Sequence, residues 1–362
     1  MVNGIFLGAF FISALIACAV TPFVIRWARA LGVVDDPRRR PHPATLHKKP
    51  VPRGGGIPIF IALLFTTLIF LPLNGKLLAI LAGSALILII GLLDDRQHIS
   101  PVVRLIANAL AGILVVASGI SILFVTNPLG GIISLDEPTI TITLFGASYV
   151  IPIFAQLLAI VWIIAVTNIV SWSSGVDGQL SGFVPVAAAT IGALSLRWTE
   201  DLTQWPVVIL SLIVAGGYLG FLPWSVYPQR IMPGYSGGAL AGFLLAVLTI
   251  ISGAKVATAL IVLGIPVMDA LFTILRRIAA GKSPLWADTG HLHHRLLAVG
   301  WTKPQVATFY WVVAAILGFL VLHLNSQSKI YTIVMLAVLV GGLLLWLTRF
   351  KHLFRQPDQP IG

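Results

Sequence analysis

The chain has 362 residues, of which 58% are hydrophobic and only 10% are charged, and its formal net charge is +11. A soluble protein of this composition would have too little polar surface to cover itself, so the composition excludes the soluble globular class and predicts membrane-crossing segments. The only cysteine, Cys18, lies in the first apolar run and excludes an intrachain disulfide. No basic region precedes that run, so we expect a retained helix and not a signal peptide.

Apolar runs of sufficient length recur along the chain and predict an all-α integral membrane protein with ten or eleven transmembrane helices. The expected spans are Gly4–Phe23, Ile57–Leu73, Lys76–Leu93, Val102–Val125, Val150–Thr167, Leu180–Leu196, Trp205–Pro223, Gly237–Ile251, Val256–Leu275, Pro304–Leu324 and Ile330–Leu347. We expect one membrane domain over residues 1–350 and a short cytoplasmic tail over residues 351–362.

A small extracytoplasmic β-hairpin is expected between Ile132 and Val150. There the run Thr139-Ile-Thr-Ile-Thr-Leu alternates polar and apolar residues, after the turn-like Asp136-Glu137-Pro138. No chemistry is assigned to this segment.

The basic residues are distributed unevenly between the loops. With the N-terminus outside, 19 of the 23 Lys and Arg residues fall in cytoplasmic loops and the tail. The positive-inside rule therefore predicts a multi-pass protein of the cell membrane, with the N-terminus outside and the C-terminus in the cytoplasm. The same bias explains the net charge, so we expect no nucleic-acid partner.

Two adjacent carboxylates, Asp94 and Asp95, follow the third apolar run. They stand at the C-terminal end of a helix, where the helix dipole disfavours anions and two like charges repel, so stability alone does not explain them. Such a pair suits Mg²⁺ or the proton of a phosphate, because magnesium prefers oxygen ligands. The alternative is solvated loop charge beside Arg96.

A second polar cluster is the run Gly290-His-Leu-His-His-Arg295. Its imidazole and guanidinium donors suit the oxygens of a pyrophosphate. Ordinary loop histidines are one alternative. A zinc site is another, although no Cys or carboxylate other than Asp288 stands in a standard ligand spacing.

The run Arg53-Gly54-Gly55-Gly56 opens the second span. Backbone N–H groups at a helix N-terminus beside an arginine can bind an anion, and the alternative is a flexible linker. Asp269 lies inside the ninth span, where an ionisable group is costly, and we expect it to have a structural role with a buried partner.

Taken in order, these motifs resemble those of the polyprenyl-phosphate N-acetylhexosamine-1-phosphate transferases of glycosyltransferase family 4. The N-acetylglucosamine branch is a closer match than the muramoyl-pentapeptide branch. The resemblance rests on Pro52-Arg53-Gly-Gly-Gly-Ile57, Gly91-Leu-Leu-Asp-Asp95, Asn168 through Gly175-Val-Asp-Gly178, Gly220-Phe-Leu-Pro223, Pro266-Val-Met-Asp269 with Arg276 and Arg277, and His291-Leu-His-His-Arg295.

The resemblance implies transfer of a sugar 1-phosphate from a UDP-sugar to polyprenyl phosphate at the cytoplasmic face. UMP would be released, Mg²⁺ or Mn²⁺ would be used, and the product would initiate a cell-envelope glycan. Carried over by position, the catalytic residues would be Asp94, Asp95, Asp177 and His291, with Asp95 and Asp177 at the metal. The substrate-binding residues would be Arg53, Arg104, Asn168, Gly175, His293, His294 and Arg295. A homodimer is compatible with this assignment.

The chain departs from the family pattern on the metal and nucleotide side. Ser174 and Tyr235 stand where aspartates are expected, and Ser171 and Ser225 stand where asparagines are expected. A neutral phenol is a poor magnesium ligand, and two lost carboxylates remove negative charge from the site. Two further hypotheses stay open: a catalytically silent paralogue that binds lipid phosphate or a partner enzyme, and a transporter, for which only Asp269 lies near mid-membrane.

Overall fold

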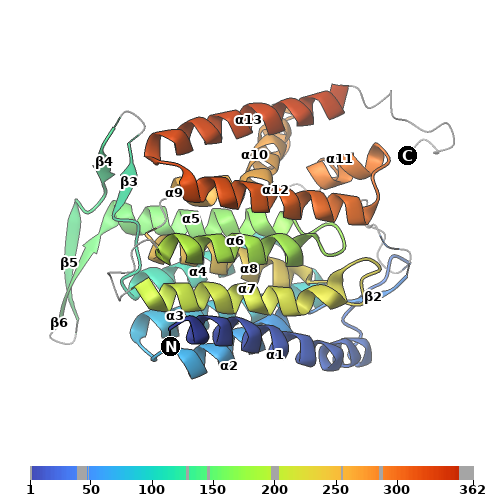
Figure 1. Cartoon of the computed structure of the whole chain (residues 1–362), viewed down its shortest axis with the longest axis horizontal. Coiled ribbons are helices and arrows are strands. Elements are labelled where there is room, and N and C mark those ends of the chain that lie inside the picture. Colours follow the sequence, from blue (N-terminus) through green and yellow to red (C-terminus); the bar gives the residue numbers. More distant parts are fainter. Residues whose placement is uncertain are drawn as a thin grey trace.

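The computed structural model describes residues 2–38, 47, 49–127, 130–144, 147–196, 204–253, 256–284 and 288–349. These ranges are mostly helical (Figure 1). The helices are α1 Val2–Ala30, α2 Gly56–Phe70, α3 Gly75–Gln97, α4 Pro101–Ala117, α5 Ile153–Trp172, α6 Gln179–Ser195, α7 Trp205–Ser225, α8 Gly234–Ile251, α9 Val256–Val262, α10 Gly264–Ala279, α11 Leu292–Ala298, α12 Lys303–His323 and α13 Ser326–Arg349. The strands are β1 Val34–Asp35, β2 Val51–Pro52, β3 Phe124–Thr126, β4 Ile132–Ser134, β5 Thr139–Leu144 and β6 Ala147–Pro152.

Each expected span coincides with one helix or, in one case, with two. In the described ranges, seven helices are long and apolar enough to cross a membrane, and the bent pair α9–α10 passes the same test when taken together. The helices α2, α4 and α6 are apolar but shorter. The protein is therefore a multi-pass, all-α membrane protein, as predicted.

Two spans differ from the prediction in their extent. The span expected over 102–125 ends at Ala117, and Gly119 then adopts a positive φ of 88°, which turns the chain out of the helix towards β3. The span expected over 256–275 is bent by 89° between α9 and α10. Pro266 has no N–H to donate to the carbonyl of Val262, so the helical hydrogen bonding is interrupted at this point.

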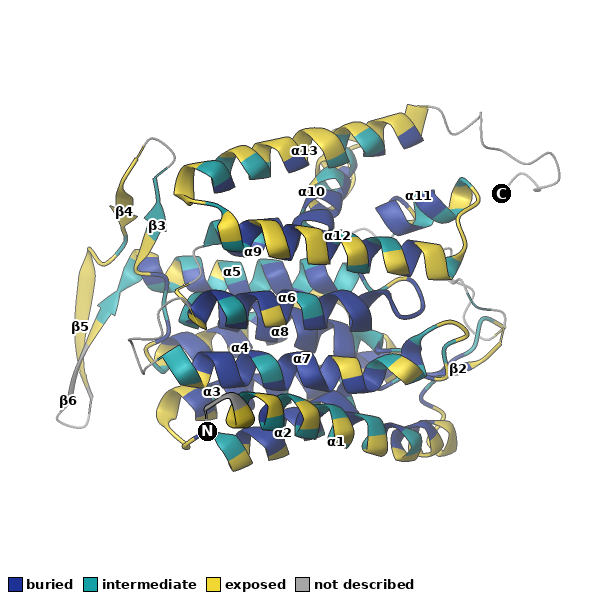
Figure 2. Ribbon diagram, viewed as in Figure 1, coloured by how far each residue is buried: buried dark blue, intermediate teal, exposed yellow. Residues whose placement is uncertain are grey.

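The core of the bundle lies around α7 and α8. From Ser236 to Thr249 every residue of α8 is buried, and Figure 2 shows both helices dark blue between more exposed outer helices. Close packing depends on glycine: a Cβ on Gly91 of α3 would lie 2.4 Å from the Cα of Ser236, and one on Gly242 would lie 2.5 Å from the Cα of Thr167 in α5. These contacts bring α3 and α5 directly against α8.

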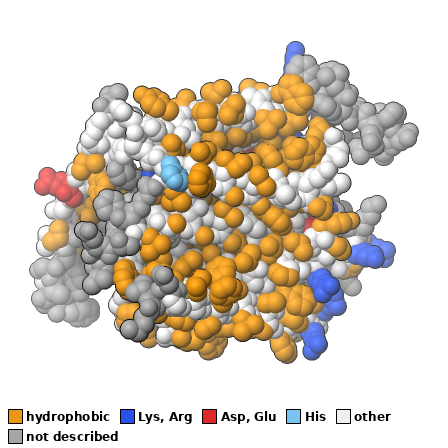
Figure 3. All heavy atoms as spheres, viewed as in Figure 1, with side chains coloured by type: hydrophobic (Ala, Val, Ile, Leu, Met, Phe, Trp, Pro, Cys, Tyr) orange, Lys and Arg blue, Asp and Glu red, His pale blue; other side chains and the backbone are white. Residues whose placement is uncertain are grey.

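The short strands lie at the two ends of the bundle. The hairpins β3–β4 and β5–β6 project from the end where α1 begins, whereas β2, α11 and the end of α13 lie at the opposite end (Figure 1). Lys and Arg side chains visible on one face gather at that second end (Figure 3). The expected hairpin is present, but Asp136–Pro138 joins β4 to β5, and the reversal within the hairpin falls between Leu144 and Ala147.

Candidate active site

Asp95 caps the N-terminus of α8. Its Oδ1 accepts a hydrogen bond from the backbone N–H of Tyr235 at 2.8 Å, and its Oδ2 accepts one from the Ser236 hydroxyl at 2.6 Å and a longer one from the Ser236 N–H at 3.3 Å. An anion is favourable at this end of a helix, because the first N–H groups have no partner within the helix. Although Asp95 stands at the unfavourable end of α3, it lies at the favourable end of α8.

Glycines make this contact possible. Gly234 has φ +66°, and a Cβ there would lie 2.3 Å from both carboxylate oxygens of Asp95. The glycine run before α2 packs on the same helix end: the N–H of Gly55 donates to the carbonyl of Met232 and the N–H of Gly56 to the Ser236 hydroxyl. In this structure those two N–H groups thus bind α2 to the start of α8, and an anion-binding role for the run stays a prediction.

Asp94 points to different partners. Its Oδ2 lies 3.6 Å from Nη1 of Arg104 in α4, and the Arg104 guanidinium lies 5.1 Å from the centroid of the Tyr235 ring. The Tyr235 hydroxyl is in turn hydrogen-bonded to the Asn108 side chain. Tyr235, which stands where the family pattern has an aspartate, is thus part of a polar contact between α4 and α8.

Arg53 is held by the chain segment that precedes α2. Its Nη2 donates to Oδ2 of Asp35 at 2.6 Å, and its charge acts on both Asp94 and Asp95. His47 also contacts Asp35, with its Nε2 3.2 Å from the Asp35 carbonyl oxygen and 3.9 Å from Oδ2. Asp35 therefore orients the arginine that faces the aspartate pair.

Asp177 lies in the loop between α5 and α6, which we call the Asp177 loop (residues 173–178). Its Oδ1 accepts from Nζ of Lys303 at 3.0 Å, and its Oδ2 accepts from the backbone N–H of Gln229 at 3.3 Å. The indole N–H of Trp311 donates to the carbonyls of Gly178 and Gln179. The loop is therefore held mainly by α12.

The histidine loop (residues 288–295) packs on the Asp177 loop. A Cβ on Gly175 would lie 2.1 Å from Nε2 of His293, and the rings of Trp172 and His291 are 6.2 Å apart. On the other side, Ser171 lies 3.1 Å from the position of a Cβ on Gly238, one turn into α8 from Tyr235. Contacts through α5 and α8 thus connect the histidine loop with the surroundings of the aspartate pair.

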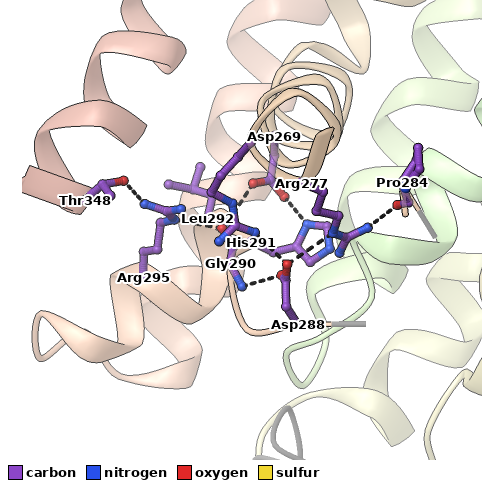
Figure 4. Close-up of polar contacts among 10 residues, drawn as sticks. Asp269, Arg277, Pro284, Asp288, Gly290, His291, Leu292, Arg295 and Thr348 are labelled. Carbon is purple, nitrogen blue, oxygen red and sulfur yellow. Dashed lines mark hydrogen bonds and ion pairs between the residues drawn. The ribbon is translucent and has the colours of Figure 1, made fainter. Parts of the chain in front are cut away.

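Asp269 orients the histidine loop (Figure 4). Nδ1 of His291 lies 2.9 Å from Oδ2 of Asp269, and the backbone N–H of Leu292 donates to Oδ1 at 2.7 Å. Because a carboxylate accepts hydrogen bonds, this contact favours a proton on Nδ1 of His291. The sequence predicted a structural role for Asp269 with a buried partner, and His291 is such a partner.

Ion pairs hold the start of the histidine loop, and hydrogen bonds hold its other end. Asp288 accepts from Arg276 at 2.8 Å and from Arg277 at 3.1 Å (Figure 4). Arg295 donates to the carbonyls of Gly290 and Leu344 and to the hydroxyl of Thr348, which connects the loop with α13.

The loop carries two shifted pKa values. Burial alone would raise the pKa of Asp288, but hydrogen bonds from Arg277, Gly290 and Arg276 outweigh it and lower the pKa to about 2. Burial, with the charges of His294 and His291, lowers the pKa of His293 well below its ordinary value of 6.5. At neutral pH the loop therefore combines a charged Asp288 with a neutral His293.

Known proteins resemble this chain over the residues of the candidate site. The family model of glycosyl transferase family 4 matches residues 77–253, which include the aspartate pair, the Asp177 loop and α8. Over these residues the chain is similar to glycosyl transferase family 4. The histidine loop lies outside the matched residues.

Three curated proteins are similar to this chain over most of its length. It is 28% identical to the probable undecaprenyl-phosphate N-acetylglucosaminyl 1-phosphate transferase of Bacillus subtilis, over 92% of this chain and 88% of that protein. It is also 28% identical to the decaprenyl-phosphate N-acetylglucosaminephosphotransferase of Mycolicibacterium smegmatis (84% and 79%) and to the undecaprenyl-phosphate alpha-N-acetylglucosaminyl 1-phosphate transferase of Yersinia pestis (90% and 86%).

The carboxylates of Asp95 and Asp177, which are expected at the metal, do not fit a divalent metal ion as they lie. Both oxygens of Asp95 bind the start of α8, and both oxygens of Asp177 bind Lys303 and Gln229. Ser174 donates to the carbonyl of Ser171. Within the described ranges no three His, Cys, Asp or Glu side chains are grouped as metal ligands. The Mg²⁺ or Mn²⁺ expected from the sequence stays a prediction without a preformed site.

The expected site residues thus fall into two connected groups at one end of the bundle. Arg53, Asp94, Asp95 and Arg104 surround the start of α8, whereas Gly175, Asp177, His291 and His293 lie where the two loops meet; His294 is adjacent to His293, with ring centroids 4.3 Å apart. Asn168 donates to the Ile164 carbonyl of its own helix, and Arg295 faces α13. Their substrate-binding roles stay predictions.

Sequence reasoning missed the specific partners of these groups. Lys303 entered only the count of basic residues, and Asp35 and Asn108 were not considered. Lys303 did carry a signal, because a cation at the first position of a helix is disfavoured by the helix dipole. Asp35 and Asn108 carried none, since a single polar residue in a loop or an apolar helix is common.

Proposed function

We propose that this protein transfers a sugar 1-phosphate from a UDP-sugar to polyprenyl phosphate and releases UMP, as an early step in making a cell-envelope glycan. The relatives named above support this proposal, since their names specify a polyprenyl phosphate acceptor and N-acetylglucosamine 1-phosphate as the transferred group. N-acetylglucosamine is accordingly the first sugar to test.

One observation on this chain itself supports the proposal. The Asp94–Arg104 pair lies next to apolar side chains that face outward from the bundle. Leu93, Val102 and Ile106 flank the pair and are exposed, as residues in contact with lipid tails are. A phosphate carried on a lipid can therefore reach Arg104 while its tail stays in the bilayer. The Asp177 loop and the histidine loop lie at the same end of the bundle and, in the proposed orientation, would be on the cytoplasmic side, where a water-soluble nucleotide can bind.

In the proposed reaction a phosphate oxygen of the lipid attacks the β-phosphorus of the UDP-sugar. The new O–P bond forms while the bond from the β-phosphorus to the bridging oxygen breaks, and the electron pair leaves with UMP. Arg104 offsets the charge of the lipid phosphate, and Asp94 accepts its proton. His291, oriented by Asp269, contacts the diphosphate. Because the carboxylates do not fit a metal ion, no step is assigned to one.

The same proposal includes the orientation in the cell membrane. The N-terminus and the β-hairpins would face outside, and the loops of the candidate site would face the cytoplasm, where nucleotide sugars are made. The uneven distribution of Lys and Arg supports this orientation. A homodimer stays a prediction.

The test is UMP release by purified protein given polyprenyl phosphate and UDP-N-acetylglucosamine, with Mg²⁺, with Mn²⁺ and with EDTA. We expect turnover that falls at least about 10²-fold in Asp94→Asn, because a positioned proton acceptor contributes about 10² to 10⁴ in rate. The matched control is Asp136→Asn at the opposite end of the bundle, which should keep full activity.

Other outcomes would contradict the proposal. No turnover with any UDP-sugar, together with a gain of activity in Tyr235→Asp combined with Ser174→Asp, would identify a silent paralogue. Uptake of a solute into vesicles without UMP release would identify a transporter.

A further inference from the structure

Lys303 places a positive charge beside the carboxylate of Asp177, where the family resemblance implies a metal ion. Its Nζ lies 3.0 Å from Oδ1 of Asp177 and 5.6 Å from the centroid of the Tyr227 ring, and its side chain is 17% exposed. The pair is thus largely shielded from water, yet a ligand can reach the ammonium group.

The helix that carries Lys303 holds it firmly in this place. Thr302 and Gln305 form a capping box at the start of α12, and Trp311 of the same helix donates to the backbone of the Asp177 loop. A lysine at the first position of a helix opposes the helix dipole, so helix stability does not account for it. Its placement is explained by the carboxylate that it faces.

The carboxylates that remain near the candidate site are already neutralised by the protein. Asp94 faces Arg104, Asp177 faces Lys303, and Asp95 is bound to the helix start. The two other expected carboxylates are replaced by Tyr235 and Ser174. A divalent cation at Asp177 would have to displace the ammonium group, and Asp95, the other carboxylate expected at the metal, has both oxygens bound to the start of α8.

We propose that Lys303 takes the place of a divalent cation by binding the diphosphate of the nucleotide at Asp177, so that the protein binds its nucleotide without metal. An ammonium group has three N–H donors. One is used on Asp177 and one points over the Tyr227 ring, which leaves the third for a phosphate oxygen. This inference rests on the proposed function for the identity of the nucleotide.

The same contact acts in the proposed transfer. When the bond between the β-phosphorus and the bridging oxygen breaks, negative charge increases on the leaving UMP. An ammonium group beside that phosphate stabilises the charge without any metal ligand. Asp177 then serves as the positioning residue for Lys303.

The test measures binding of UDP by calorimetry in EDTA, in the full-length protein. Wild type should bind UDP, and Lys303→Ala should bind it about 10- to 100-fold more weakly, as expected for one hydrogen bond between charged groups. Lys303→Arg should restore most of the affinity. Lys282→Ala, which removes one exposed positive charge elsewhere, should bind like wild type.

A double variant separates a direct contact from an indirect one. In Lys303→Ala combined with Asp177→Asn, the unpaired carboxylate is removed together with its partner. UDP binding should stay weak if Lys303 contacts the diphosphate. Recovery of binding would show that the single variant suffers only from repulsion by Asp177, and the inference would be wrong.

Metal binding provides a second readout besides activity. We expect no stoichiometric Mn²⁺ signal in electron paramagnetic resonance titrations of the wild type, with or without UDP. The inference is overturned by UDP binding that requires Mg²⁺ or Mn²⁺, or by an Mn²⁺ site that Asp177→Asn removes. UDP binding in EDTA that depends on Lys303, but no UMP release with any lipid phosphate, would refute the proposed function and support this inference.

Discussion

Asp94 and Asp95 are neighbours in the sequence but have different tasks. Consecutive residues of a helix point about 100° apart, so the two side chains of α3 meet different elements. Asp95 faces α8 and binds the first turn of that helix, whereas Asp94 faces Arg104 of α4. The proposed reaction therefore assigns the proton transfer to Asp94, whereas Asp95 stabilises the start of α8.

A substitution at Gly234 tests the role assigned to Asp95. Gly234→Ala introduces a Cβ 2.3 Å from both Asp95 oxygens at a φ of +66°. We expect a fall of several degrees in the melting temperature in detergent, since the left-handed conformation alone costs about 1–2 kcal/mol. Gly341→Ala in α13, where a Cβ meets nothing within 4 Å, is the control and should melt no earlier than wild type. Equal melting of Gly234→Ala and wild type would contradict the capping role.

At the scale of elements, the site depends on one helix start and two loops. α8 supplies its first turn to Asp95, α12 holds the Asp177 loop through Lys303 and Trp311, and Asp269 of α10 holds the histidine loop. The contacts of Asp95 and of Lys303 join elements more than 100 residues apart in the sequence, whereas Asp269 holds the loop that follows its own helix.

The histidine loop should become less stable in mild acid. The pKa of His293 is well below 6.5 in the folded loop, so the unfolded loop binds more protons. Stability is then full above about pH 6.5 and is lost as the pH falls towards the lowered pKa. Asp288, with a pKa of about 2, stays ionised and cannot cause a change in this range.

Hydrogen exchange of residues 288–300 between pH 7.5 and 5.5, corrected for the intrinsic rates of the free peptide, measures this effect. Protection should decrease with falling pH in wild type and stay constant in His293→Gln, which cannot be protonated. Constant protection in wild type would show that the neutral, buried state of His293 does not limit the loop.

At the scale of the whole molecule, the two ends of the bundle differ in charge and in content. One end carries the β-hairpins, and the other carries β2, α11 and the loops of the candidate site (Figure 1). This arrangement predicts which residues face each side of the membrane.

Labelling with a membrane-impermeant maleimide checks the orientation in whole cells. In a Cys18→Ser background, Thr141→Cys in the exposed part of β5 should react in intact cells. Lys282→Cys, at the other end, should react only after the membrane is permeabilised. The reverse pattern would place the candidate site outside and would contradict a reaction with a cytoplasmic nucleotide.

The sequence by itself determined the class of this protein, the position of its helices and the end at which its polar motifs gather. Apolar run length and loop charge are local quantities that the bilayer acts on directly, so no tertiary information was needed. Even the hairpin could be predicted from its alternating pattern, although the turn within it could not.

Only the tertiary structure decided which polar group faces which. Lys303 and Asp177 are 126 residues apart, and Asp95 and Ser236 are 141 apart. Such pairs form only where two elements approach closely. Gly91 and Gly234 allow this approach because a Cβ at either position would clash with the neighbouring residue. A local pattern does not encode that approach. For this reason the sequence predicted metal ligands at Asp95 and Asp177, whereas in the folded bundle a helix start and a lysine bind their oxygens.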